Sequence, residues 1–422
     1  MLQPFLDARR LPSSRKVQGL SSSNTAPLAG LKVVELARIL AGPWIGQTLA
    51  DLGADVIKIE APMGDDTRRW GPPFVTRADG GAGDAAYYHA CNRGKRSLVA
   101  DLRDADDVAR VHKLAARADV FIENFKVGGL ARFGLDYPSL HGRNPRLVYC
   151  SVTGFGQDGP YAARAGYDAM IQAMGGIMSL TGAPDGPPQK IGVAFADLFA
   201  AQHGIIAIQA ALLQRAHTGV GQHIDIALLD SMVGMLANQA MNYLASGQVP
   251  QRLGSAHPNI VPYQPFAAQD GELMLAVGND AQFMRLCAVL DLPELAADAR
   301  FADNASRVQH RHALEPMLAA AFAQRPRADV LVALERAGIP AGPINTLADV
   351  FADPQVRHRG LRLELSDAAT AGGALPGLRT PIRFSDAALA TQTRAPQLGE
   401  HSAAVRAALA ASPAWPARED AA

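Results

Sequence analysis

The stretch LKVVELARILAGPWIGQTLADLGADVIKIE, residues 31–60, decides the fold. Its first part, LKVVELA (31–37), is a short apolar run that predicts a buried strand. AGPWIGQTLADLGA (41–54) has apolar residues at helical spacing and a glycine near its end, which favours a helix and its stop. DVIKIE (55–60) predicts a second strand. A strand, a helix and a strand in this order form a βαβ unit, and such a unit requires a parallel sheet.

The same alternation continues along the chain. We expect further strands at 97–102, 119–125 and 146–156, with a helix at 104–118. The pattern predicts a doubly wound α/β domain. Downstream, the sequence predicts a helix at 204–219, a strand and one long helix within 223–247, an irregular segment at 249–265, a smaller region of short elements from 271 to about 325, and a helix with a Gly/Pro turn at 328–345.

The composition is that of a globular protein, with 48% hydrophobic and 19% charged residues. A chain of 422 residues exceeds one ordinary core, which favours two domains. The formal net charge is zero, so bulk electrostatics gives no reason to expect a nucleic-acid partner. No uninterrupted apolar run is long enough to suggest a membrane span. Three distant cysteines, Cys91, Cys150 and Cys287, predict neither a disulfide framework nor a zinc site and favour a reducing, cytoplasmic location.

Residues 1–29 differ in composition from the rest, with four basic residues, several serines and one acid. We expect a disordered N-terminal extension outside the fold. The alternative is a transit peptide, which would place the protein in mitochondria.

Several enzyme classes lack their signatures. The turn ARILAGPWIG (37–46) has no GxGxxG, and Pro43 removes an amide that a pyrophosphate would need, which argues against a nicotinamide dehydrogenase. Neither a P-loop nor a GxSxG motif is present. His203, His217 and His223 fit no zinc spacing, so no metal site is expected.

The segment IGVAFADLFAAQHG (191–204) contains one acid, Asp197, among small and apolar neighbours. Aspartate is a preferred N-cap residue, so Asp197 would suit the start of a helix predicted from about 198 to 216. The same position would suit a carboxylate nucleophile, because the helix start would keep it ionised and apolar neighbours would leave it poorly hydrated. The residues alone leave both interpretations open.

Other segments could contact a ligand or serve as ordinary turns and surface. Tyr167 and Asp168 lie in AGYDAMIQAMGG (165–176), after the glycine-rich turn GFGQDGP (154–160). Glycines there would permit close approach of the backbone to a ligand. The basic positions that could hold an anionic cofactor are NRGKRS (92–97), Arg103, ENFKVGG (123–129) and Arg132.

Taken in order, these stretches resemble the class III CoA-transferase family, the fold group of formyl-CoA transferase, carnitine CoA-transferase and α-methylacyl-CoA racemase. The resemblance runs from Leu31 to His401. The motifs that carry it are AGPWIGQTLADLGADVIKIEAPMGDDTR (41–68), NRGKRS (92–97), ENFKVGGLARFGL (123–135), NPRLVYCSVTGFGQDGP (144–160), GYD (166–168), AGIPAGPIN (337–345) and LGEH (398–401).

The resemblance implies an α/β fold with a large Rossmann-like domain, which holds a parallel sheet, and a smaller α+β domain. The large domain is expected at 30–225 and again at 326–422, and the small domain with its linkers at 226–325. Two subunits are expected to interlock as a homodimer. Coenzyme A would be a substrate, with no prosthetic group, no metal, no nucleic acid and no membrane partner.

The resemblance also implies the site. Asp197 follows the G-P-P-containing loop in GAPDGPPQKIGVAFAD (182–197), where the family has its nucleophile. Its carboxylate would attack an acyl-CoA thioester, form an anhydride and then an aspartyl-CoA thioester, with nearby backbone amides stabilising each oxyanion. Ala61 stands where the family often has an arginine. The CoA contacts carried over by position are Leu40, Ala41, Ala61, the segment Ala100 to Arg103, Asn124, Phe125, Lys126, Arg132, Tyr167 and Asp168.

Two features bear on the reaction. The racemases have a histidine where this chain has Tyr167, and tyrosine, with a reference pKa near 10, is a poor base, so a transferase is favoured. GSAHPNIVPYQPF (254–266) replaces the glycine run that closes over oxalate, and it resembles relatives that use succinyl-CoA and dicarboxylic acids such as glutarate. The alternatives are a racemase-type epimerase and a non-catalytic CoA-binding paralogue in which Asp197 is only a cap.

Overall fold

The structure, a computed structural model, describes residues 25–418. The prediction of a disordered extension therefore lies mostly outside the described residues, since it covers 1–29. Its last part is wrong, because residues 25–29 belong to the fold. The amide of Leu28 donates to the carbonyl of Leu52 at 2.8 Å, and the Leu28 side chain packs against the main core.

A six-stranded sheet forms the larger of two bodies, and all its strand pairs are parallel. In space the strands follow the order β5-β2-β1-β6-β7-β8. The order reverses between β1 and β6, which makes their carboxyl ends the topological switch point of a doubly wound sheet. The predicted parallel α/β sheet is confirmed. The strands are β1 Lys32–Leu36, β2 Asp55–Glu60, β5 Arg96–Val99, β6 Val120–Glu123, β7 Val148–Thr153 and β8 His223–Ala227.

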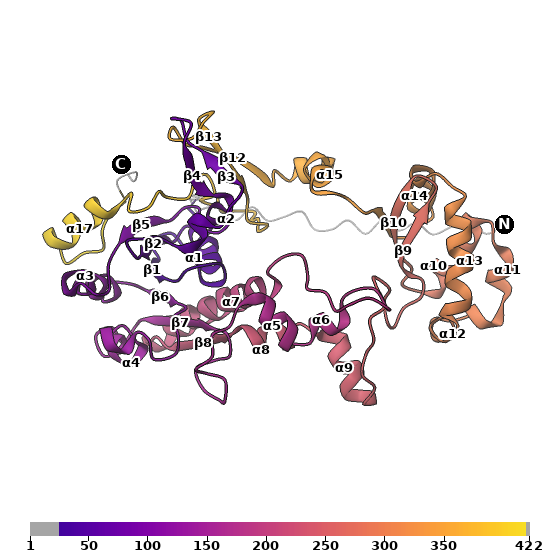
Figure 1. Cartoon of the computed structure of the whole chain (residues 1–422), viewed down its shortest axis with the longest axis horizontal. Helices are drawn as coiled ribbons and strands as arrows, with labels where there is room; N and C mark the ends of the chain where they lie inside the picture. The colour runs from indigo at the N-terminus through magenta and orange to yellow at the C-terminus, as the bar shows by residue number, and fades with distance from the viewer. Residues whose placement is uncertain (1–24, 419–422) are drawn as a thin grey trace, which may run out of the picture.

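Helices cover both faces of this sheet because successive strand residues point to opposite sides. Val33 joins one core with residues of α1 (Ala41–Asp51), α5 (Asp168–Met174) and α7 (Phe195–Thr218). Val34 joins the other core with residues of α3 (Ala105–Ala115) and α17 (Ser402–Ala411). The C-terminal α17 therefore returns to the larger body, where it lies beside α3 (Figure 1).

One helix, α7, is long and apolar enough to cross a membrane by length and composition alone. It is a core helix in this fold. Ala200, Ile205 and Ile208 are buried in the core that it shares with the sheet and α1. The sheet therefore accounts for the apolar character of its buried face.

The smaller body is built on an antiparallel sheet with the order β11-β10-β9. Its core contains side chains from Val261 to Ile339. Its elements are β9 Tyr263–Ala268, β10 Gly271–Ala276, α10 Asp280–Leu290, α11 Pro293–Ala297, η3 Ala299–Phe301, α12 Asn304–Gln309, α13 Arg311–Ala323, α14 Arg327–Arg336 and β11 Ala341–Pro343.

Both predicted limits of the small domain, 226 and 325, need correction. Leu228 and Met232 of α8 (Leu228–Gly234) pack into the core of the larger body, directly after its last strand. At the other limit, α14 packs its apolar face into the smaller core and β11 completes the smaller sheet. The long helix predicted within 223–247 is also interrupted, because Ala237, the first residue of α9 (Ala237–Ser246), adopts a left-handed φ of 45°.

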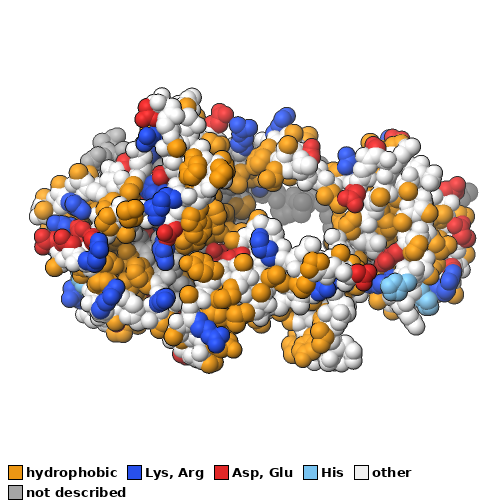
Figure 2. Space-filling view, in the orientation of Figure 1, with side chains coloured by type: hydrophobic (Ala, Val, Ile, Leu, Met, Phe, Trp, Pro, Cys, Tyr) orange, Lys and Arg blue, Asp and Glu red, His pale blue; other side chains and the backbone are white. Residues whose placement is uncertain are grey.

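Two segments, 236–260 and 344–361, join the two bodies, and the space-filling view shows an opening between them (Figures 1 and 2). Residues 362–378 form a hairpin beside the larger body. The remaining elements are η1 Asp66–Arg69, β3 Phe74–Thr76, β4 Ala82–Ala85, α2 Ala86–Ala90, η2 Ala131–Phe133, α4 Tyr137–His141, α6 Ile177–Leu180, α15 Leu347–Ala352, α16 Pro354–His358, β12 Arg362–Ser366 and β13 Ala374–Leu378.

Candidate active site

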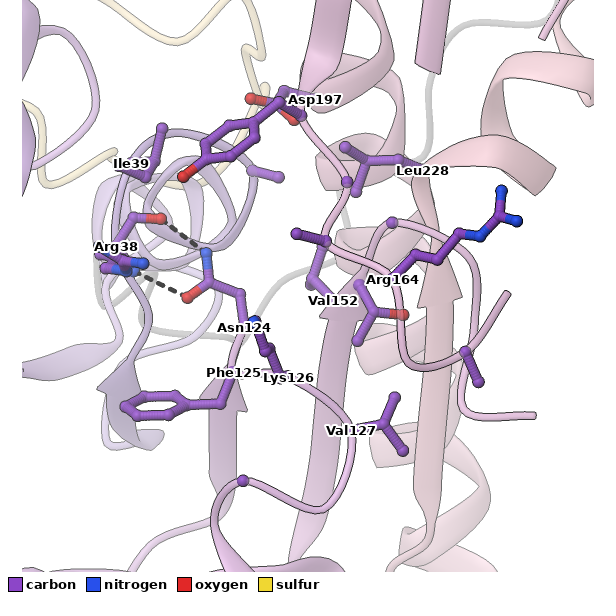
Figure 3. A pocket seen from close by; sticks show the side chains of 18 of the residues that line it. Arg38, Ile39, Asn124, Phe125, Lys126, Val127, Val152, Arg164, Asp197 and Leu228 are labelled. Carbon is purple, nitrogen blue, oxygen red and sulfur yellow. Dashed lines mark hydrogen bonds between the residues drawn. The ribbon is translucent and has the colours of Figure 1, made fainter. Parts of the chain in front are cut away.

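A cavity of about 580 Å³ opens at the carboxyl ends of β1, β6 and β7. This is the switch point of the sheet, where open α/β sheets bind their ligands. Its size lies in the range of small-molecule sites, which are roughly 300–1,000 Å³. Its wall is formed by the loops after these strands, by the start of α7 and by Tyr167, and Figure 3 shows these side chains converging from separate elements.

The structure brings most of the predicted site residues to this cavity. Those that line it are Leu40, Ala41, Asn124, Phe125, Lys126, Arg132, Tyr167 and Asp197. Ala61 and Ala100 do not, because they follow β2 and β5 on the other side of β1. Arg103 does not either. Its side chain is 87% exposed and pairs with Asp101 at 2.7 Å.

Asp197 lies in the first turn of α7, which begins at Phe195. The prediction that it is the N-cap of a helix beginning near 198 is therefore wrong. Its side chain lines the cavity although the residue is only 9% exposed, and no residue within 25–418 forms a hydrogen bond to its carboxylate. Burial, and then the nearby charge of Asp168, raise its pKa to about 7. The helix start does not hold it fully ionised, contrary to the prediction from sequence.

Asp168 performs the capping that the sequence suggested for Asp197. One of its oxygens, Oδ1, accepts hydrogen bonds from the amides of Ala196 at 2.8 Å and Asp197 at 3.3 Å. The other, Oδ2, accepts from Gln172 Nε2 at 2.7 Å. Because α5 supplies this carboxylate, α7 begins without a cap of its own, and Asp168 touches α7 rather than the cavity.

Asn124 joins the two strands that flank the switch point. Its Oδ1 accepts from the Arg38 amide at 3.0 Å, and its Nδ2 donates to the Arg38 carbonyl at 2.7 Å (Figure 3). Both ends of the Asn124 amide are therefore engaged by the loop after β1. Its position beside the cavity was predicted, but this bridging contact was not.

Cations dominate the charge of the cavity wall, whose lining includes Arg38, Lys126, Arg132 and Arg164 and one acid, Asp197. The guanidinium of Arg38 also pairs with Asp66. Such a set suits a phosphate-bearing ligand. Sequence reasoning missed two of them. Arg38 directly follows the first strand at the switch point, a position that could have identified it. Arg164, which stacks on Tyr161 with 3.9 Å from Cζ to the ring centre, follows no comparable rule.

NRGKRS (92–97) does not face an anionic ligand, contrary to expectation. Its basic side chains are buried in ion pairs: Arg93 with Asp51 at 2.7 Å, Lys95 with Glu35 at 2.7 Å and Arg96 with Asp55 at 2.6 Å. The glycines predicted to let the backbone approach a ligand instead let two backbone segments approach each other. A Cβ on Gly154 would lie 2.6 Å from the Cα of Gly166, so these two backbones touch at the cavity wall.

Comparison with known proteins agrees with this geometry. The family model described as CoA-transferase family III matches residues 28–402. The chain is 56% identical over 384 residues to a succinate–glutarate CoA-transferase of Agrobacterium fabrum, covering 91% of this chain and 96% of the relative. It is 44% identical over 377 residues to the succinyl-CoA:glutarate CoA-transferase of Mus musculus, covering 89% and 85%.

Among solved structures, a CAIB/BAIF family protein from Brucella suis superposes with a TM-score of 0.81 and 61% sequence identity, covering 92% of this chain and 100% of that one. The family model and these relatives each span most of the chain. The chain therefore belongs to CoA-transferase family III, enzymes that take CoA thioesters as substrates.

Proposed function

We propose that the protein transfers CoA from succinyl-CoA to a dicarboxylic acid such as glutarate through covalent intermediates on Asp197. One observation carries the proposal: the Asp197 carboxylate is buried, accepts no hydrogen bond from residues 25–418, and lies in a cation-lined cavity at the switch point. The names of the relatives support the choice of donor and acceptor.

The steps follow from carboxylate chemistry. An Asp197 oxygen attacks the thioester carbonyl, the C–S bond breaks, and CoA leaves as a thiolate from a mixed anhydride. The thiolate then attacks the aspartyl carbonyl of the anhydride, which releases succinate and leaves an aspartyl-CoA thioester. The acceptor carboxylate attacks this thioester and expels the thiolate. Attack of the thiolate on the acceptor's acyl carbonyl forms the new acyl-CoA and frees Asp197.

The donors that stabilise the oxyanions come from α1 in this proposal. The first amides of α7 already have partners, since Ala196 and Asp197 donate to Asp168 and Leu198 donates to the Ala194 carbonyl. In contrast, α1 begins at Ala41 on the cavity wall, and the first amides of a helix have no intrahelical acceptor. Pro43 has no N–H and the Trp44 amide donates to the Leu40 carbonyl, so the donors in this proposal are the amides of Ala41 and Gly42. These amides are suited to a developing negative charge.

Mass spectrometry after incubation with succinyl-CoA, without acceptor, tests the covalent step. We expect a hydroxylamine-sensitive adduct confined to the peptide that contains Asp197 and absent from Asp197→Ala. An adduct on another peptide, or equal labelling of the variant, would contradict the assignment. Deuterium exchange at the α-carbon of a 2-methylacyl-CoA would instead indicate a racemase.

The rate of transfer should depend on pH through Asp197. Because only the carboxylate attacks and its pKa is raised to about 7, kcat/KM for succinyl-CoA should rise with pH and level off above about 7. Asp168→Asn keeps a capping oxygen but removes the neighbouring charge, so the midpoint should move to lower pH. Asp185→Asn, at an exposed aspartate, serves as the matched control and should leave the midpoint in place. A higher midpoint in Asp168→Asn would contradict this account.

We also propose that two chains interlock as a homodimer. Large apolar side chains are exposed on α7 and α9, including Ile206 at 64%, Leu213 at 69% and Leu244 at 71%. Exposed apolar groups in such numbers typically mark an interface. The opening between the two bodies gives a partner chain room to pass (Figure 2). Sedimentation equilibrium should give twice the chain mass of 44.5 kDa, and a monomer mass would exclude the arrangement.

A further inference from the structure

Ile39 has an unusual backbone conformation at the cavity wall. Its φ is 73°, in the left-handed region, and it lies in the loop between β1 and α1. A β-branched residue adopts this conformation only where its surroundings hold it. The loop must therefore be fixed by contacts outside itself, and its conformation decides where the start of α1 meets the ligand.

Asp65 makes the contact that holds Ile39. The Ile39 amide lies 3.3 Å from both carboxylate oxygens of Asp65. Asp65 is itself fixed, because Oδ1 accepts from the Thr67 amide at 3.0 Å and from its hydroxyl at 2.8 Å. Only 3% of Asp65 is exposed, so no solvent competes for these bonds.

Lys58 anchors Asp65 from below the loop. Its Nζ lies 3.0 Å from Asp65 Oδ2 and 3.0 Å from Glu35 Oε1, and it donates to the Ala37 carbonyl at 2.7 Å. Burial alone would lower the pKa of Lys58, but the carboxylates of Glu35, Asp65 and Glu60 raise it above its usual value, so the side chain stays charged. One ammonium thus binds the loop carbonyl before Ile39 and the carboxylate that binds its amide.

We propose that Asp65, anchored by Lys58, is a positioning residue that holds Ile39 in its left-handed conformation and so sets the cavity wall for the CoA moiety. Neither Asp65 nor Lys58 lines the cavity, so the two side chains act through Ile39 rather than by touching a ligand. The inference rests on the proposed function only for the identity of the ligand.

Calorimetric titration with free CoA and steady-state kinetics with succinyl-CoA test the proposal on the full chain. In Asp65→Asn, an amide NH₂ replaces one carboxylate oxygen and the charge that pairs with Lys58 is lost, so the Ile39 amide keeps at most one of its two acceptors and its restraint weakens. We expect the Kd of CoA and the KM of succinyl-CoA to rise about tenfold, with kcat changing less than about threefold. An unchanged Kd and KM would overturn the proposal.

Ile39→Gly supplies the rescue, because glycine adopts a positive φ without steric cost. In the Ile39→Gly/Asp65→Asn double variant, we expect the Kd of CoA to return to within about threefold of Ile39→Gly alone. A loss of general packing would not be rescued by removing a side chain. Equal Kd values for the double variant and Asp65→Asn would contradict a role through Ile39.

Asp51→Asn is the matched control, since it breaks another buried pair, with Arg93 at 2.7 Å, that does not contact the loop. It should lower stability without changing the Kd of CoA. If Asp65→Asn does not fold, Thr67→Val removes one hydrogen bond to Asp65 and should give a smaller rise in Kd, whereas no rise would overturn the proposal. Wild-type protein that binds no CoA would contradict the proposed function itself, and wild-type binding with no effect of these variants would contradict only the positioning role.

Discussion

Asp197→Ala is expected to lower kcat/KM for CoA transfer by about 10³-fold or more while leaving CoA binding within about threefold of wild type. In the proposed mechanism the Asp197 carboxylate forms both covalent intermediates, and among residues 25–418 the cavity wall holds no second acid to replace it. The cations that suit the phosphates of CoA, among them Arg38 and Arg164, remain in place. Steady-state kinetics with succinyl-CoA and glutarate, beside calorimetry with CoA, measures both quantities.

Asp197→Asn is the control for shape, because it keeps the volume of the side chain and removes the carboxylate that the proposed attack requires. Burial raises the pKa of Asp197 to about 7, so its ionised form is unfavourable in the folded state. The native protein then binds more protons than the unfolded chain between the two pKa values, and its stability falls as pH rises through this range. Asp197→Asn should therefore be more stable than wild type at pH 8, by a margin that shrinks toward pH 4. Retained transfer, or a fold lost at pH 8, would contradict the assignment.

The sheet could be predicted from sequence because its signals are local. Strands β1 and β2 are apolar runs, and α1 between them has helical spacing and a glycine after it. Their parallel pairing follows from the βαβ connection. The switch point then predicts a ligand beside the ends of β1 and β6, where the cavity lies.

The site's finer contacts could not be predicted because they join residues far apart in the chain. Asp168 caps α7 from 28 residues away. The helix therefore begins at Phe195, earlier than predicted, and Asp197 lies in its first turn rather than at its N-cap. Asn124 binds Arg38 across 86 residues. The basic run NRGKRS looks like an anion site by composition, and only the fold shows that Asp51, Glu35 and Asp55 neutralise it.

The predicted limits of the smaller body were wrong for a related reason. The residues of α8 and α14 do not themselves mark a boundary, because each is a short helix with one apolar face. Which core each helix joins depends on tertiary packing. Met232 packs into the larger core and Leu334 into the smaller one, and the local hydrophobic periodicity predicts neither contact.

Glu35→Gln is expected to lower the free energy of unfolding by about 3–5 kcal/mol, the largest effect on stability that we predict. Glu35 is fully buried, and its carboxylate pairs with Lys58 at 3.0 Å and Lys95 at 2.7 Å. Glutamine has the same shape but no charge, so Lys58 would keep Asp65 as an ion-pair partner, while Lys95 would lose the only carboxylate with which it pairs among residues 25–418. Helix α1 packs tightly against this carboxylate, since a Cβ on Gly46 would lie 1.7 Å from Glu35 Oε2, so the side chain at position 35 has little room to move. Urea denaturation measures the change.

Asp101→Asn is the control for this prediction, because it breaks an ion pair with the exposed Arg103 and should change the free energy of unfolding far less than Glu35→Gln does. The penalty in Glu35→Gln should also depend on pH. Burial already lowers the pKa of Lys95, and loss of Glu35 would lower it further. Between the lowered pKa of Lys95 and the ordinary lysine pKa, the unfolded chain of the variant then binds more protons than the native state. The free energy of unfolding of the variant should therefore rise with pH, and its difference from wild type should become smaller. A penalty that is equal at pH 6 and pH 9 would show that packing, rather than the buried charges, determines the loss.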